Sequence, residues 1–159
     1  FENIRYRTVW ATREDVERAA RVVGAHDFIT LLANGYDTIL EEQARNLSLG
    51  QRQLLSFARA LVADAKILIL DEATANIDSQ TERQIQTALK RLLEGRTGIV
   101  IAHRLATVRG ADRIIVLQNG HIVETGPHAA LVAQGGLYAR LYDLNYASFD
   151  DVPEDQFTE

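Results

Sequence analysis

The sequence predicts an α/β fold in which a helical part precedes a small parallel sheet. Two runs of strand length, 67–70 and 97–103, flank one amphipathic segment of helical length. This β-α-β order is typical of parallel strands joined by a crossover helix. Amphipathic helical patterns fill most of the chain before residue 63, and a hairpin pattern lies near residue 120. The 159 residues, 47% of them hydrophobic, suffice for a domain with a real core.

The first predicted helix covers residues 13–23. Thr12, followed three residues later by Asp15, is a capping-box pattern, and Gly24 suits the position just after a helix. A second, short helix is expected over 27–33. These two segments predict that the chain begins with helices rather than with strands.

The next helix follows a loop. Residues 34–46 are polar and contain asparagine and glycine, which is typical of a connecting segment. Ser48 is a good N-cap, and the helical pattern after it continues to about Val62. The apolar residues of this helix fall on one face, namely Leu54, Leu55, Ala58 and Leu61.

The β-α-β part follows. Residues 67–70 are apolar at every position, which is the pattern of a central parallel strand buried on both faces. The run 97–103 predicts a second buried strand. Between them, Ser79 with Glu82 forms another capping-box pattern. The helix that it opens carries one apolar stripe, formed by Ile85, Leu89, Leu92 and Leu93.

The last part predicts a hairpin and two helices. Asn119-Gly120 between apolar segments is a strong signal for a tight β-turn. Pro127 suits the start of a helix, and the residues over 137–146 predict a last one.

The charge of the chain belongs to its C-terminal tail. The formal net charge is −5, and the last ten residues alone carry five acids and no base. These acids are Asp150, Asp151, Glu154, Asp155 and Glu159. We interpret the tail as a disordered, solvated end. The rest of the chain is neutral and has no basic field, so we expect no nucleic-acid partner.

Composition excludes several other kinds of site and sequence. The chain has no cysteine, which excludes disulfides and thiolate metal sites. No apolar run approaches the ~18 residues that a membrane span needs, and nothing resembles a signal peptide. The chain has no methionine and starts with Phe1, so we expect it to be a fragment of a longer protein.

Two segments carry residues suited to chemistry. Asp71 and Glu72 follow the first strand, and the carboxyl edge of a parallel sheet is where ligands bind. An Asp there can hold Mg²⁺ through water, and a Glu can accept a proton from an attacking water. In the sequence LSLGQ, Ser48 offers a hydroxyl at a helix start, and Gly50 allows a ligand to approach the backbone. Free N–H groups at such a helix start favour an anion.

Each segment by itself also has an ordinary structural interpretation. A strand can end in solvated acids, and a serine can simply cap a helix. The combination is far more specific. LSLGQRQLLSFARAL, then ILILDEATANID, then IVIAHRL resembles the ATP-binding cassette (ABC) family, and more closely the nucleotide-binding domain of an ABC exporter. The resemblance covers about 1–142.

The resemblance implies roles for individual residues. The signature motif, which binds ATP, is matched by Leu47, Ser48, Leu49, Gly50 and Gln51. Asp71 matches the Walker B residue on the Mg²⁺ shell, Glu72 the catalytic carboxylate, and His103 the switch histidine that contacts the γ-phosphate. Asp78 matches the D-loop residue that bridges the two sites of a dimer.

The family also implies an arrangement. Two nucleotide-binding domains pair head to tail, as a homodimer or a heterodimer, so the signature acts on ATP held by the partner. Asp71, Glu72 and His103 act on ATP held by their own chain. The transmembrane domains of the transporter are the other partners, at the cytoplasmic face of the cell membrane.

The resemblance implies a division of the chain. Residues 1–63 correspond to the helical signature subdomain, and 64–146 to the C-terminal part of an ATPase core similar to P-loop NTPases. Residues 147–159 are the acidic tail.

The sequence departs from the family pattern at three places. Leu49 stands where glycine is commonest, and Glu41 and Ala44 stand where exporters often have glycine. The phosphate-binding sequence G-x-x-x-x-G-K-[ST] is absent, because the two lysines, Lys66 and Lys90, do not follow glycines. We therefore expect the P-loop and the Q-loop glutamine to precede Phe1, and we expect the chain alone to bind ATP weakly and to be inactive.

Two other functions remain open at this point. Chromosome-maintenance and DNA-repair ATPases share the signature and the Asp-Glu pair, but long coiled coils interrupt their domains. Alternatively, the chain alone is a non-catalytic interaction module without turnover.

Overall fold

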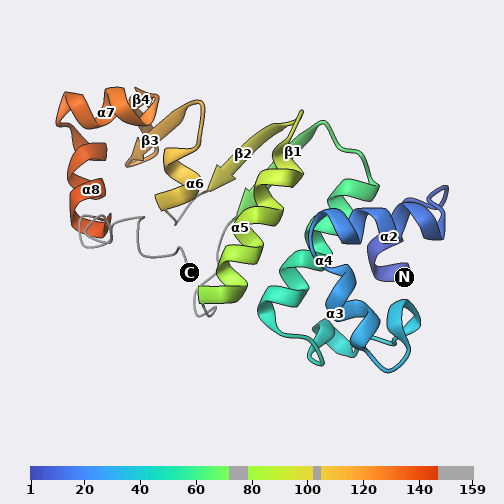
Figure 1. Cartoon of the computed structure of the whole chain (residues 1–159). Coiled ribbons are helices and arrows are strands. Elements are labelled where there is room, and N and C mark those ends of the chain that lie inside the picture. The colour runs from blue at the N-terminus through green and yellow to red at the C-terminus, as the bar shows by residue number, and fades with distance from the viewer. Residues whose placement is uncertain (72–78, 102–104, 147–159) are drawn as a thin grey trace, which may run out of the picture. The chain divides into compact units, whose positions relative to one another are not determined.

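The structure is a computed structural model, and it describes residues 1–71, 79–101 and 105–146. The chain divides into two compact units, Phe1–Ile101 and Ala102–Glu159. Figure 1 shows helices and strands in the order expected, with helices first, then β-α-β, then a hairpin. The α/β class predicted from the sequence is therefore confirmed.

The first unit contains helices, two short 3-10 turns and one pair of strands. In chain order they are α1 (Glu2–Arg5), α2 (Arg13–Val22), α3 (His26–Leu31), η1 (Gly35–Asp37), η2 (Glu42–Ala44), α4 (Leu49–Val62), β1 (Ile67–Asp71), α5 (Ser79–Leu93) and β2 (Thr97–Ile101). The second unit contains α6 (Leu105–Arg109), β3 (Ile114–Gln118), β4 (His121–Gly126), α7 (His128–Gln134) and α8 (Leu137–Tyr146).

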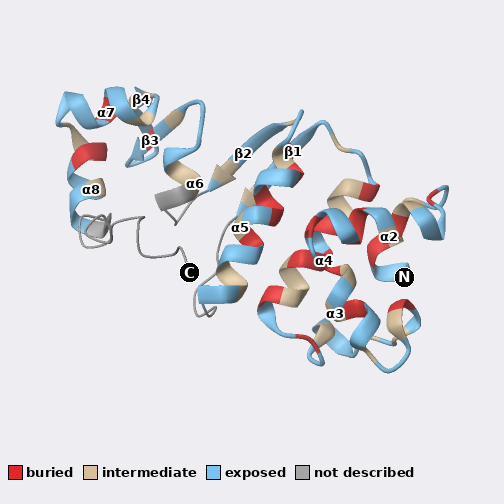
Figure 2. Ribbon diagram, viewed as in Figure 1, coloured by how far each residue is buried: buried red, intermediate tan, exposed pale blue. Residues whose placement is uncertain are grey.

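Helix α4 is the centre of the first unit, where it packs against α1, α2 and α5. Figure 2 shows buried positions on the facing sides of α2, α4 and α5. The predicted α4 face is buried at Leu54, Leu55 and Ala58. Phe57 and Val62 are buried as well, because α4 has neighbours on more than one side. Helix α4 therefore lies at the centre of the hydrophobic core of the first unit.

Helix α2 begins where the capping-box pattern predicts. The Thr12 hydroxyl accepts from the Asp15 N–H at 3.2 Å, and the Asp15 carboxylate accepts from the Thr12 N–H at 3.0 Å. Both bonds satisfy N–H groups that a helix start otherwise leaves without partners.

The expected loop over 34–46 is confirmed as a connection that contains only the turns η1 and η2.

The expectation that both strands are buried on both faces is wrong. β1 and β2 are parallel, and Ile69 pairs with Ile99. Leu68 is buried and Leu93 of α5 lies over Gly98, so a helix covers this face. The other face carries four exposed isoleucines, Ile67, Ile69, Ile99 and Ile101. Within the first unit, the described residues cover one face of the strand pair.

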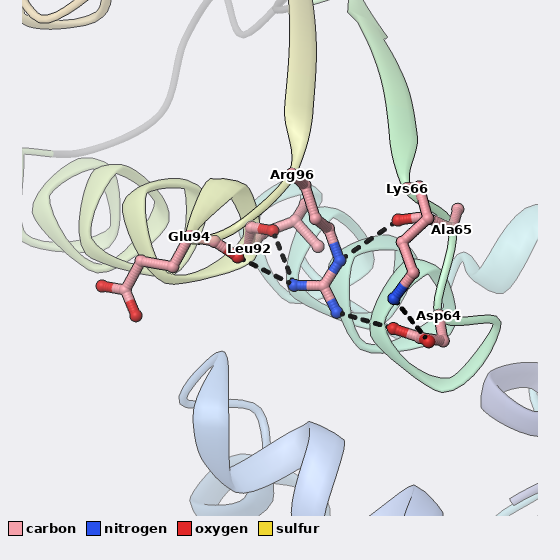
Figure 3. Close-up of polar contacts among 6 residues, drawn as sticks. All are labelled: Asp64, Ala65, Lys66, Leu92, Glu94 and Arg96. Atoms are coloured by element: carbon pink, nitrogen blue, oxygen red, sulfur yellow. Dashed lines mark hydrogen bonds and ion pairs between the residues drawn. The ribbon is translucent and has the colours of Figure 1, made fainter.

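Arg96 connects the two strands at the edge where both begin. Its Nε donates to the Ala65 carbonyl at 3.1 Å, and its Nη1 donates to the Leu92 carbonyl at 3.2 Å. Figure 3 shows the guanidinium lying between the end of α5 and the turn before β1. Asp64 in this turn has φ 47°, and its carboxylate accepts from Arg96 Nη2 at 3.2 Å. The arginine thus holds the entry to β1 beside the entry to β2.

The hairpin of the second unit forms at the predicted turn. Asn119 and Gly120 have φ 51° and 78°, which the tight two-residue turn requires. From β4, the Glu124 carboxylate accepts the backbone N–H groups of Leu137 and Tyr138 at the start of α8. This carboxylate caps α8 with charge of the favoured sign.

The acidic tail, 147–159, lies outside the described residues. The division expected at residue 63 stays a prediction about subdomains of the family. In the structure, α4 and α5 pack together on either side of that boundary.

Candidate functional site

The turn that opens α4 carries most of the predicted signature residues. Ser48 is the N-cap, and its hydroxyl accepts from the Gln51 N–H at 3.2 Å. The Gln51 side chain accepts from the Ser48 N–H at 3.0 Å. The two residues therefore form a reciprocal capping box. Sequence reasoning found the Ser48 cap and missed Gln51 as its partner, although the three-residue spacing contains that signal.

The capping box leaves the Ser48 hydroxyl able to bind an anion. A hydroxyl that accepts one hydrogen bond still has its own hydrogen to donate. Ser48 is exposed, and the first turn of α4 carries no acidic side chain. The 14 residues of α4 place a partial positive charge at this end. Leu47 is buried beneath the turn, and Leu49 is exposed. Leu47 thus anchors the turn in the core, while Ser48 is accessible to a ligand.

Gly50 is buried between two helices. A Cβ built at this position would lie 2.1 Å from Thr81 Cγ2, on the first turn of α5. The same Cβ would lie 3.7 Å from Ile85 Cδ1, which is an ordinary contact distance. The structure therefore gives this glycine a reason in helix packing, whereas the sequence interpretation assigned it to ligand access. Thr81 was not identified from the sequence.

The loop before the signature is fixed to α4. Gln43 and Ala44 have φ 56° and 52°, in the left-handed region that favours glycine. Arg52 on α4 donates from Nη1 to the Gln43 carbonyl at 3.1 Å, so its side chain supports the strained segment. Asn46 accepts from the Glu41 N–H at 3.3 Å and closes the same loop. The glycine-to-alanine departure at Ala44 thus falls on a position where glycine is favoured.

Asp71 ends β1 at the edge where β2 also ends. The two strands are parallel and in register, with Asp71 opposite Ile101. Asp71 is exposed, so its carboxylate is accessible at the carboxyl edge of the sheet. Glu72, Asp78 and His103 lie outside the described residues. The structure therefore shows where Asp71 and the signature turn lie, and the roles assigned to all of these residues stay predictions.

Two features are absent from the described part of the chain. No group of three or more His, Asp or Glu residues lies close enough there to hold a metal ion. None of the helices in that part is both long and apolar enough to cross a bilayer.

Comparison with known proteins identifies the family. The family model described as ABC transporter matches residues 1–75. The ABC transporter ATP-binding protein YknV of Bacillus subtilis is 56% identical over 148 residues, which is 93% of this chain and 24% of the relative. An ATP-dependent lipid A-core flippase of Salmonella typhimurium is 51% identical over 145 residues, or 91% of this chain and 25% of the relative.

A solved structure gives the same result. A bacterial Atm1-family ABC exporter with ATP bound superposes with a TM-score of 0.81 at 39% identity. The match covers 91% of this chain and 25% of the exporter chain. This chain thus spans about a quarter of the length of these relatives. The signature turn, the parallel strands and these similarities agree, and the chain belongs to the ABC transporter family as part of an exporter-type ATP-binding domain.

Proposed function

We propose that this chain works within an ABC exporter in which ATP binding and hydrolysis drive substrate across a membrane. It would lie at the cytoplasmic face, paired with a second nucleotide-binding domain and with transmembrane domains. The relatives support this proposal, because they include a flippase that depends on ATP and an exporter solved with ATP. They also favour an exporter over the DNA-repair and chromosome-maintenance ATPases.

The observation that carries the proposal is the exposed turn of Ser48. Its hydroxyl can donate to a phosphate oxygen while the Gln51 N–H holds it from behind. The N–H groups at the start of α4 add donors that point the same way. A γ-phosphate presented by the partner domain fits this chemistry. Leu47, Leu49 and Gly50 shape the turn, and Ser48 makes the contact.

The acids after β1 would act on the nucleotide of their own chain. Asp71 is an accessible oxygen donor at the end of a parallel strand, which fits a water-mediated Mg²⁺ site. Bound Mg²⁺ would neutralise charge on the phosphate oxygens. Glu72 would accept a proton from the attacking water, and His103 would contact the γ-phosphate. Asp78 would link the two sites of the dimer.

A second function applies to the 159 residues by themselves. They contain no G-x-x-x-x-G-K-[ST] sequence, which supplies the backbone N–H groups and the lysine that hold the β- and γ-phosphates. This observation favours a binding module without turnover when the chain is alone.

The experiment that tests the main proposal is Ser48→Arg in the whole exporter. A bulky cation would fill the space that the partner's γ-phosphate needs. We expect the ATP-induced dimer to be lost while ATP binding to the mutated chain itself persists. Crosslinking across the dimer, with and without ATP, measures closure.

Ser56→Arg is the matched control, because Ser56 is an exposed serine two turns further along the same helix. We expect that variant to form the ATP-induced dimer. A normal ATP-induced dimer in Ser48→Arg would refute the trans role of the signature turn.

A further inference from the structure

The first turns of α4 and α5 touch at Gly50. Position 50 is buried, and the direction in which a side chain would project is filled by the Thr81 methyl group. A Cβ there would lie 2.1 Å from Thr81 Cγ2, closer than any real contact allows. The next atoms, Thr81 Cβ at 3.6 Å and Ile85 Cδ1 at 3.7 Å, are at ordinary contact distances. One methyl group therefore accounts for the whole collision.

This contact joins two parts of the proposed site. Gly50 lies two residues after Ser48 in the capped turn, and Thr81 lies in the first turn of α5. α5 follows Asp71 after the short segment 72–78. The turn that would bind the partner's ATP thus rests on the helix that follows the acids acting on the chain's own ATP.

We propose that Thr81 is a positioning residue for Ser48, and that its methyl group is the reason for glycine at position 50. The positioning role rests on the proposed function of Ser48, whereas the packing role does not. Thr81 sets how closely α4 approaches α5, and Gly50 allows that approach. A side chain at position 50 would force the capped turn away from α5 and displace Ser48.

The competing explanation is that position 50 needs glycine because a ligand approaches the backbone there. The two explanations predict opposite effects of Gly50→Ala on stability. Without a collision, alanine is a better helix residue than glycine, so Gly50→Ala would stabilise α4. With the collision, the same substitution forces atoms of a packed contact to move and destabilises it.

The first experiment is a double-mutant cycle in the 159-residue chain, followed by thermal unfolding with circular dichroism. We expect Gly50→Ala to lower the midpoint by on the order of 5 °C. Thr81→Ser removes Cγ2 and keeps the hydroxyl, with its hydrogen-bonding capacity. In that background, Gly50→Ala should raise the midpoint instead of lowering it. This reversal of sign is the signature of the methyl contact.

Thr81→Val is the matched control, because it keeps a methyl group at the same place and removes the hydroxyl. Gly50→Ala should remain destabilising in the Thr81→Val background. The packing proposal is overturned if Gly50→Ala raises the midpoint of the unmodified chain. It is equally overturned if the decrease is the same in the Thr81→Ser background.

The second experiment measures ATP hydrolysis by the whole exporter at a temperature where each variant is folded. We expect Gly50→Ala to lower kcat at least tenfold, and Gly50→Ala/Thr81→Ser to recover most of it. A double variant that regains stability but not kcat would show that a ligand needs the glycine, and it would overturn the positioning role. If Ser48→Arg instead forms a normal ATP-induced dimer, the proposed function fails while the packing result stands.

Discussion

Lys66 donates from Nζ to the Asp64 carboxylate at 2.9 Å, on the same side chain that accepts from Arg96 (Figure 3). The hydrogen bond from Lys66 is the main reason why the pKa of Asp64 lies below its ordinary value of 3.8, and Arg96 contributes in the same direction. The two cations therefore favour the ionised form of the carboxylate in the turn before β1.

This arrangement predicts a pH dependence of stability. A carboxyl group with a lowered pKa binds fewer protons in the folded chain than in the unfolded chain near pH 3.8. Its stabilisation is present above that pH and is lost as the pH falls through it and below. We expect Asp64→Asn to flatten the decrease in unfolding free energy between about pH 5 and pH 2.5. Urea titrations across this range measure the slope.

Lys66→Gln is the companion variant for that measurement. It removes the largest cause of the lowered pKa and leaves the carboxylate with Arg96. Its slope should lie between those of the unmodified chain and Asp64→Asn. Identical slopes in all three proteins would contradict the role given to Asp64.

A second prediction concerns the loop before the signature. Ala44 has φ 52°, in the left-handed region. A residue with a Cβ is strained in this conformation, whereas glycine is not. We expect Ala44→Gly to stabilise the chain by ~1 kcal/mol, after part of the relief is offset by the greater freedom of glycine when unfolded. Chemical denaturation measures the change.

Ala63→Gly provides the opposite case for comparison. Ala63 follows α4 with φ −69°, a conformation that alanine adopts without strain. Glycine there should destabilise by about 0.5–1 kcal/mol. If both substitutions shift stability in the same direction, the backbone at position 44 does not carry the strain that we assign to it.

A third prediction concerns Glu72 in the whole exporter. Glu72→Gln keeps the size of the side chain and removes its ability to accept a proton. We expect ATP to bind normally and hydrolysis to fall by roughly 10²–10⁴-fold, the usual contribution of a general base. Phosphate release and nucleotide binding are measured side by side. Glu94→Gln, at an exposed position after α5, is the control for loss of one charge. Hydrolysis above half of the normal rate in Glu72→Gln would remove Glu72 from the mechanism.

The fourth prediction concerns the 159-residue chain alone. P-loop proteins hold phosphates with successive backbone N–H groups and one lysine, and no such sequence occurs here. Asp71 and Glu72 would instead repel a polyphosphate. We therefore expect isothermal titration calorimetry with Mg·ATP to show no tight binding. We also expect no ATP hydrolysis. A micromolar Kd, with hydrolysis that Glu72→Gln abolishes, would mean that another group of residues holds the phosphates.

Local interactions explain what could be predicted from the sequence. Helix α2 begins at Thr12 and Asp15, and the hairpin turns at Asn119-Gly120, because both features depend on residues within four positions of one another. The Ser48 cap belongs to the same class. The family motifs then assign chemistry to Asp71, Glu72 and His103, of which the structure describes Asp71.

Contacts between distant segments decided the rest. The isoleucines of β1 and β2 have a buried pattern, yet Ile67 and Ile99 are exposed because the helix that packs on the strand pair covers the opposite face. Arg52 donates to the Gln43 carbonyl, and the Glu124 carboxylate caps the start of α8. Both contacts join residues nine or more positions apart in the sequence.

The sequence by itself therefore determined the family, the order of elements and the caps of α2 and α4, because each of these depends on short stretches of residues. Only the tertiary structure decided why position 50 is glycine. The Thr81 methyl group reaches Gly50 from 31 residues away in the sequence, across the contact of α4 with α5. Periodicity and motif spacing describe one segment at a time, whereas close packing depends on which atoms two segments bring to the same point.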